Sequence, residues 1–113
     1  MELYKRRGLI CPVPGESWHS AVGVAAANVT TALVAGEIYK LTVSSACYVR
    51  QSTTASPQAA SAGAGSLLIN PGHHDLLFEG DHGNIISVIR VATDGVCTLQ
   101  RVHFVSSTGG YPF

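Results

Sequence analysis

The chain has 113 residues, a length that makes one domain and leaves no room for a second. Hydrophobic residues make up 46% of it, charged residues only 12%, and the formal net charge is zero. This composition excludes a chain that is disordered throughout, and it argues against nucleic acid as the main partner, because neutralising phosphates needs a basic surface. A charged share about half the usual one favours a subunit attached to a larger assembly.

The sequence also indicates the compartment. The start, MELYKRRGLICPVPG, has basic residues without an apolar stretch behind them, and no run approaches the ~18 apolar residues of a membrane span. We therefore expect neither a signal peptide nor contact with a membrane. The cysteines Cys11, Cys47 and Cys97 are odd in number and lack Cys-x-x-Cys spacing, which favours reduced thiols in a cytosol.

Residues 1–17 are predicted to form an extended N-terminal arm. Pro12, Pro14 and Gly15 interrupt any regular strand ladder, so the segment is not expected to join a sheet. Such an arm can lie on a neighbouring subunit, and a frayed terminus is the alternative. The candidate partner contacts in the arm are the consecutive basic residues Lys5, Arg6 and Arg7.

The next segments predict strands. Residues 18–35 are rich in β-branched side chains, some of which alternate with small residues. In IYKLTVSS, from residue 38 to 45, Tyr39, Leu41 and Val43 share one face, the period-two pattern of a half-buried strand. Another short strand is predicted at 46–51. A Ser/Ala/Gly-rich loop follows at 52–65, and loops of this length are usually mobile or used for binding.

The second half of the chain repeats this pattern. Short strands are predicted at 66–70, 74–80, 84–93 and 96–105. Asp94-Gly95 between the last two predicts a β-hairpin. Residues 107–113 are predicted to form a flexible C-terminal tail, which adds two aromatic candidate contacts, Tyr111 and Phe113.

About eight short strands at roughly ten-residue spacing, with no helical pattern, predict an all-β fold. The expected architecture is a single antiparallel β-sandwich or small barrel over residues 18–106, of a jelly-roll-like type. The arm at 1–17 and the tail at 107–113 would flank it.

The stretch NPGHHDLLFEGDHG, residues 70–83, raises the question of a metal site, because imidazole and carboxylate groups bind zinc, iron or manganese. Cupins, which are small metal-binding β-barrels, carry the motif G-x5-H-x-H-x3,4-E-x6-G. Here His73 and His74 are adjacent, so on one strand they point to opposite faces. Convergence of a histidine with Glu79 and His82 through loop geometry stays open as an alternative. Solvated turns explain the stretch more simply, so we expect no metal and no cofactor.

Other catalytic chemistry has no local support either. The chain has no G-x-S-x-G motif that would mark a nucleophilic serine. Cys47 and Cys97 alternate with apolar residues, a pattern typical of buried, unreactive thiols. Trp18 is expected to anchor the core or an interface. The sequence therefore predicts a protein that is not an enzyme.

The order of segments from residue 29 to 102 resembles a known family. VTTALVAGEIYKLTVSSACYVRQS precedes a small-residue loop, and SLLINPG and NIISVIRVATDGVCTL follow it. This order is similar to that of small all-β structural proteins of tailed bacteriophages, most of all head decoration (cement) proteins. Similar stretches also occur in phage tail and fibre modules. The pattern consists of small and apolar residues, and it does not cover the arm or the tail.

The resemblance implies a structural protein of the virion, assembled in the host cytoplasm, that binds the outside of a capsid and stabilises it. Its partners would be the major capsid protein or other virion proteins, and it would form a homo-oligomer, a dimer or a trimer. A basic arm would add steering and register on an acidic capsid floor. A tail or fibre-associated receptor-binding module and a small cupin-like metal-binding protein remain the alternatives.

Overall fold

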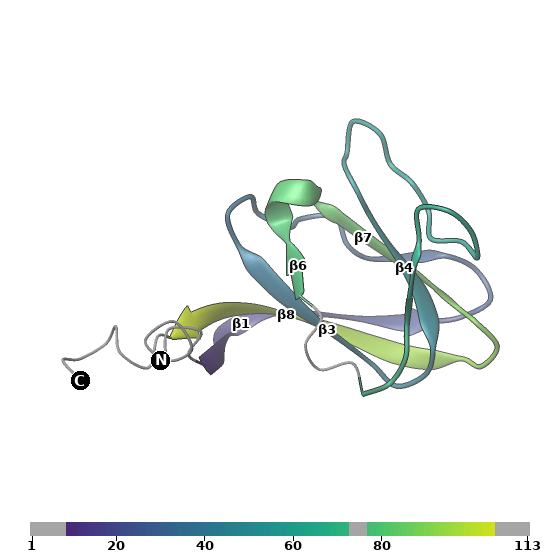
Figure 1. The fold of residues 1–113 in the computed structure, drawn as a ribbon, viewed down its shortest axis with the longest axis horizontal. Coiled ribbons are helices and arrows are strands. Elements are labelled where there is room, and N and C mark those ends of the chain that lie inside the picture. Colours follow the sequence, from purple (N-terminus) through teal and green to yellow (C-terminus); the bar gives the residue numbers. More distant parts are fainter. Residues whose placement is uncertain (1–8, 73–76, 106–113) are drawn as a thin grey trace, which may run out of the picture.

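The computed structural model describes residues 9–72 and 77–105, which form two four-stranded antiparallel sheets (Figure 1). The strand order is β1-β8-β3-β6 in sheet A and β2-β7-β4-β5 in sheet B. The all-β prediction is confirmed, and no α-helix occurs in the described ranges. The strands are β1 (Leu9–Val22), β2 (Ala27–Thr30), β3 (Ile38–Val43), β4 (Cys47–Ser52), β5 (Leu67–Ile69), β6 (Leu77–Glu79), β7 (Ile85–Arg90) and β8 (Gly95–Val105), with a 3-10 turn, η1 (Gly80–His82).

The two sheets bury their facing sides in one apolar core. In sheet A, Leu41 of β3 lies opposite Leu99 of β8, and both are fully buried. In sheet B, Val49 of β4 lies opposite Val88 of β7, and both are buried as well. The predicted alternation of β3 is therefore confirmed, and its physical cause is that successive side chains of a strand point to opposite faces.

Strand β7 is buried on both faces. Four consecutive residues, Ile85–Val88, are buried, although every second one points away from sheet A. The Ser/Ala/Gly loop covers this outer side: the backbone N–H of Ala60 donates to Oγ of Ser87 at 3.0 Å, and Ala60 itself is buried. A near-continuous apolar run is the pattern expected of a strand covered on two sides.

The prediction that residues 1–17 stay outside the sheet is wrong for residues 9–17. Strand β1 begins at Leu9, and its first residues pair antiparallel with the last residues of β8. The register shifts between Pro12 and Ser17, and Gly15 there has a positive φ of 78°. Strand β1 lies at the edge of sheet A, where one side of the strand needs no ladder partner, so its prolines and an irregularity are tolerated.

The prediction of a β7–β8 hairpin at Asp94-Gly95 is also wrong. Strand β7 belongs to sheet B and β8 to sheet A, so the turn carries the chain from one sheet to the other (Figure 1). Each of the two strands already has a neighbour on both sides, and neither has a free edge for the other. Gly95 instead allows a close approach of the β3–β4 turn, since a Cβ at this position would overlap the hydroxyl of Ser45.

Candidate functional site

The predicted partner contacts of the arm and the tail lie outside the described residues. They are Lys5, Arg6, Arg7, Tyr111 and Phe113. Their role as contacts therefore stays a prediction. The described part of the chain begins, at Leu9, directly inside a strand.

The histidine-rich stretch is described only from Leu77 onward, so His73 and His74 lie outside the described residues. Within it, Nε2 of His82 lies 3.5 Å from Oε1 of Glu79, and both side chains are mostly exposed. Oδ1 of Asp81 accepts a hydrogen bond of 2.7 Å from the backbone N–H of Gly36. These groups fasten turns together, and the described ranges hold no cluster of three or more His, Cys, Asp or Glu side chains suited to a metal ion.

The three cysteines differ in environment. Cys47 and Cys97 are fully buried members of the core, one from each sheet, and burial raises the pKa of each thiol to about 11. Neutral buried thiols are poor nucleophiles. Cys11 is partly exposed and lies opposite His103 in the β1–β8 register.

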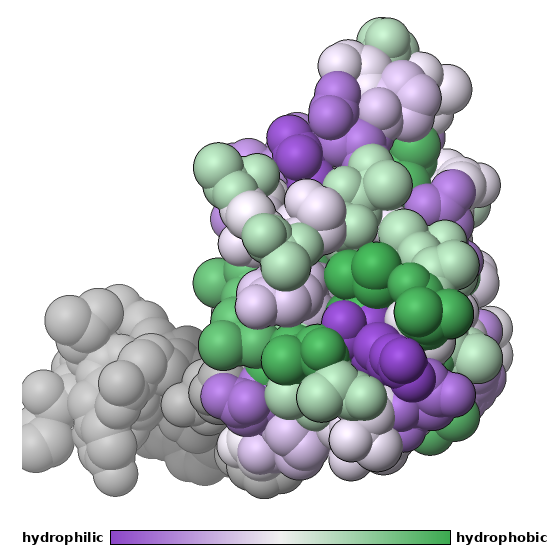
Figure 2. All heavy atoms as spheres, turned by 90° about the vertical axis from the view of Figure 1, so that its right-hand side faces the viewer, coloured by the Kyte–Doolittle hydropathy of each residue, from purple (hydrophilic) through white to green (hydrophobic). Residues whose placement is uncertain are grey.

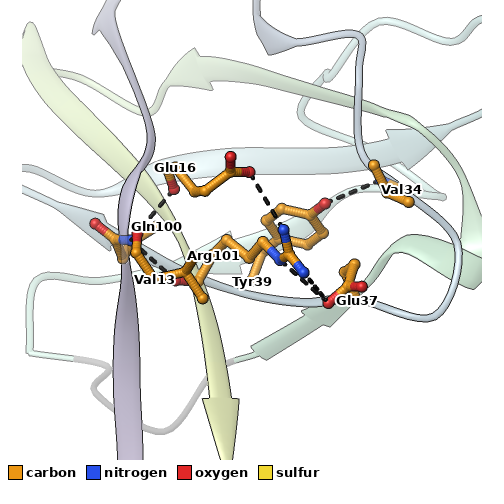
Figure 3. Close-up of polar contacts among 7 residues, drawn as sticks. All are labelled: Val13, Glu16, Val34, Glu37, Tyr39, Gln100 and Arg101. Carbon is orange, nitrogen blue, oxygen red and sulfur yellow. Dashed lines mark hydrogen bonds and ion pairs between the residues drawn. The ribbon is translucent and has the colours of Figure 1, made fainter.

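A polar cluster closes one end of the core (Figure 3). Arg101 of β8 lies opposite Tyr39 of β3, and its Nη2 is 2.8 Å from Oε1 of Glu37. A longer contact of 3.5 Å joins Nη1 to Oε1 of Glu16 in β1. The hydrogen bond to Glu37 raises the pKa of Arg101, so the guanidinium stays charged. The hydroxyl of Tyr39 accepts a 2.9 Å bond from the backbone N–H of Val34.

Gln100 supports the irregular part of β1 in the same region. Its Nε2 donates to the backbone carbonyls of Val13 at 2.9 Å and Glu16 at 3.2 Å (Figure 3). These carbonyls lie where the β1–β8 ladder is interrupted, so the amide provides partners that the ladder does not. Sequence reasoning missed the roles of Gln100 and Arg101, because period-two alternation indicates only the face on which a polar residue lies. The cluster is bound into turns and strands, and this arrangement indicates a structural role.

The described part of the surface also carries exposed apolar side chains. Among the described residues, eight large hydrophobic side chains are exposed: Ile10, Val24, Val34, Leu67, Leu68, Val91, Val96 and Phe104. Three of them gather near the turns that join β1 to β2 and β7 to β8. Figure 2 faces this end of the molecule and shows hydrophobic residues on both sides of a hydrophilic strip. We call Val24, Val91 and Val96 the apolar end.

Hydrogen bonds hold the turns behind the apolar end to one another. The N–H of Arg90 donates to the carbonyl of Gly23 at 3.0 Å, and the N–H of Val91 donates to that of Ala46 at 3.2 Å. Oγ of Ser45 donates to the carbonyl of Thr93 at 3.1 Å. The apolar end is therefore a preformed surface, which loses little conformational entropy when a partner covers it.

The chain was compared with protein families, curated proteins and solved structures. No protein-family model, no curated protein and no solved structure matches the chain. Within the described residues, no helix has the length and apolar character to cross a membrane. An interaction surface is the candidate site that these residues support best.

Proposed function

We propose that this protein is a structural virion protein of a tailed bacteriophage, which binds the outside of the capsid and stabilises it without catalysis. In this proposal the two sheets form a β-sandwich of the jelly-roll-like type. The partners are the major capsid protein or other virion proteins, and nucleic acid and membranes are not involved. Several copies of the protein would act together, so that weak contacts are multiplied over the shell.

The observation that carries the proposal is the exposed apolar surface on a charge-poor chain. Val24 is 75% exposed and Val96 is 60% exposed, on a chain with only 12% charged residues. Exposed apolar groups at one end of a molecule, rimmed by polar residues, are typical of surfaces covered by a protein partner. The resemblance to decoration proteins, which spans residues 29–102, supports the same assignment.

The capsid-facing surface in this proposal is the apolar end. Its hydrogen-bonded turns hold three valines in fixed positions, and the salt bridge between Arg90 and Asp94, at 2.7 Å, lies in the same turn region. Apolar contacts would supply most of the binding free energy, while a salt bridge at the rim contributes little and favours one register.

The test is co-sedimentation with undecorated phage shells, followed by counting the bound copies per particle. We expect saturation at a copy number set by capsid symmetry, on the order of hundreds for a decoration protein. Saturation at a few to some tens of copies would assign the protein to the tail or fibre instead. A protein that stays in the supernatant at micromolar concentration would contradict the proposal.

A pair of variants tests the surface itself. Val24→Lys places a charge in the apolar end and should weaken shell binding at least tenfold. Thr31→Lys, at another exposed position that lies outside the apolar end, is the matched control and should bind like the parent. Equal binding of the two variants would exclude the apolar end as the contact surface.

A further inference from the structure

The outer face of sheet B is covered in part. The loop at 53–66 lies over Ile85 and Ser87, and both are buried there. Beside the covered part lies a row of apolar side chains. In this row Tyr48 of β4 lies opposite Leu68 of β5 on one side and opposite Ile89 of β7 on the other. Leu68 is 47% exposed, and Tyr48 and Ile89 are partly exposed.

The row ends at an edge strand. Strand β5 is the last strand of sheet B, so one side of its backbone is left without a ladder partner among the strands of the sheet. Edge strands are usually protected against further pairing by their shortness, by charged residues, by prolines or by bulges, and β5, with three residues, has only the first of these. The opposite sheet's edge strand β1 has such protection in Pro12, Pro14 and its irregular register. The three residues of β5, Leu67–Ile69, include neither a charge nor a proline.

The charge distribution favours a second copy of the same chain as the occupant. The chain has zero net charge, and the row of Tyr48, Leu68 and Ile89 is uncharged, so the row itself brings no like charges together; Arg50, two residues from Tyr48 on the same face of β4, lies outside the row. An antiparallel edge is also complementary to itself, because a two-fold axis that is perpendicular to the sheet and lies beside the strand pairs the strand with its own copy. Leu68 is the middle residue of β5 and points outward with the row, so it is the natural position for that axis.

We infer that two copies of this chain pair antiparallel through β5, with Leu68 opposite Leu68 of the second copy. Sheet B then continues across the dimer as one sheet of twice four strands, and the apolar rows of the two copies join into one. Each copy supplies the backbone partners that the edge of the other lacks. The apolar end lies outside this interface and stays available in both copies.

The inference stands apart from the proposed function, since dimer formation is measured on the purified protein without shells. In sedimentation equilibrium, the parent should show twice the 11.8 kDa mass of one chain. Leu68→Lys sets two ammonium groups against each other at the axis and should raise the dimer dissociation constant at least tenfold. The matched control is Val24→Lys, which adds the same charge to the apolar end and should leave the dimer intact.

A second measurement reads the register directly. Residues directly opposite in an antiparallel pair have Cα atoms about 4.5–5.5 Å apart, which lies within the range that a disulfide spans. In a Cys11→Ser background, Leu68→Cys should therefore form a disulfide-linked dimer when an oxidant is added. The oxidant is diamide, a diazene that takes up the two electrons and two protons released by the two thiols. Val24→Cys in the same background should stay monomeric on a non-reducing gel.

Three results would overturn the inference. They are a parent that sediments as a monomer or as a trimer, a Leu68→Lys variant that dimerises like the parent, and a Leu68→Cys variant that cross-links no faster than Val24→Cys. Circular dichroism of each variant checks that it is folded. We expect the Leu68 variants to fold, because Leu68 is about half exposed.

Discussion

At the scale of single residues, burial decides what a substitution does. Leu41 has no exposed surface and belongs to the core cluster, whereas its neighbour Thr42 points to the outer face and is exposed. The two lie in the same strand with the same pairing partner, β8. Any difference between them therefore reports side-chain packing and not strand formation.

We expect Leu41→Ala to lower the free energy of unfolding by about 2–5 kcal/mol, the usual range for a buried leucine that leaves a cavity. Thr42→Ala should change it by less than about 0.5 kcal/mol. Denaturant titrations of both variants measure this difference. Equal losses would mean that the buried face of β3 has been assigned wrongly.

The buried thiols give a prediction about pH. Burial raises the pKa of Cys47 and Cys97 from the usual 9.0 to about 11. Between these two pH values both thiols are neutral in the folded protein, whereas the same thiols are ionised in the unfolded chain. A raised folded pKa contributes stability that is present below the unfolded value and is lost as the pH rises through the folded one. Stability should fall between about pH 9 and pH 11, and Cys47→Ala should reduce that slope. A slope unchanged by this substitution would exclude a contribution of Cys47.

The same burial predicts thiol reactivity. At pH 8 a thiol reagent should modify Cys11 in the folded protein and reach Cys47 and Cys97 only after unfolding. Mass spectrometry of the modified chain counts the labels under both conditions. Rapid labelling of all three thiols in the folded state would show that the two sheets open readily.

At the scale of elements, close backbone approaches fix how the turns pack. Gly80 opens the 3-10 turn η1, and its N–H donates to the carbonyl of Glu37 at 2.9 Å. A Cβ at Gly80 would overlap the backbone carbonyl of Val34. Backbone atoms cannot rotate away as a side chain can, so the two segments would have to separate.

We therefore expect Gly80→Ala to destabilise the fold by about 1–3 kcal/mol, as overpacking of a tight contact does. Gly23→Ala is the control, because a Cβ there meets nothing within 4 Å. Thermal unfolding of the two variants should separate them clearly. A Gly80→Ala variant as stable as Gly23→Ala would contradict the close packing of η1 against the segment before β3.

At the scale of the whole molecule, strand β1 decides which N-terminal deletion can test the basic residues Lys5, Arg6 and Arg7 without removing part of a sheet. Residues 9–12 pair with β8, and Gln100 donates to the carbonyl of Val13. Removal of residues 2–15 would therefore take part of sheet A with it. Removal of residues 2–8 would spare the described strand.

We expect deletion of residues 2–8 to leave the melting temperature within a few degrees of the parent and to weaken shell binding, more so at low salt, because Lys5, Arg6 and Arg7 are lost. Deletion of residues 2–15 should lower the melting temperature clearly. Co-sedimentation at low and high salt and thermal melts of both variants measure this. Unchanged shell binding after the shorter deletion would remove the basic residues from the list of contacts.

The sequence by itself determined the all-β class, the buried face of β3 and the approximate place of most strands. Alternation of apolar and polar residues is a local property that follows from strand geometry, so it can be read without the rest of the chain. It also placed Cys47 and Cys97 inside, since both alternate with apolar neighbours.

Only the tertiary structure decided which strands pair. Asp94-Gly95 has the local chemistry of a hairpin, but β7 and β8 each find two other neighbours, so the turn connects two sheets. Pro12 and Pro14 are unfavourable in a strand, but the edge position of β1 and the amide of Gln100 accommodate them. The exposed row at β5 likewise depends on strand order. Pairing is settled by contacts between residues far apart in the chain, and no short stretch of sequence contains that information.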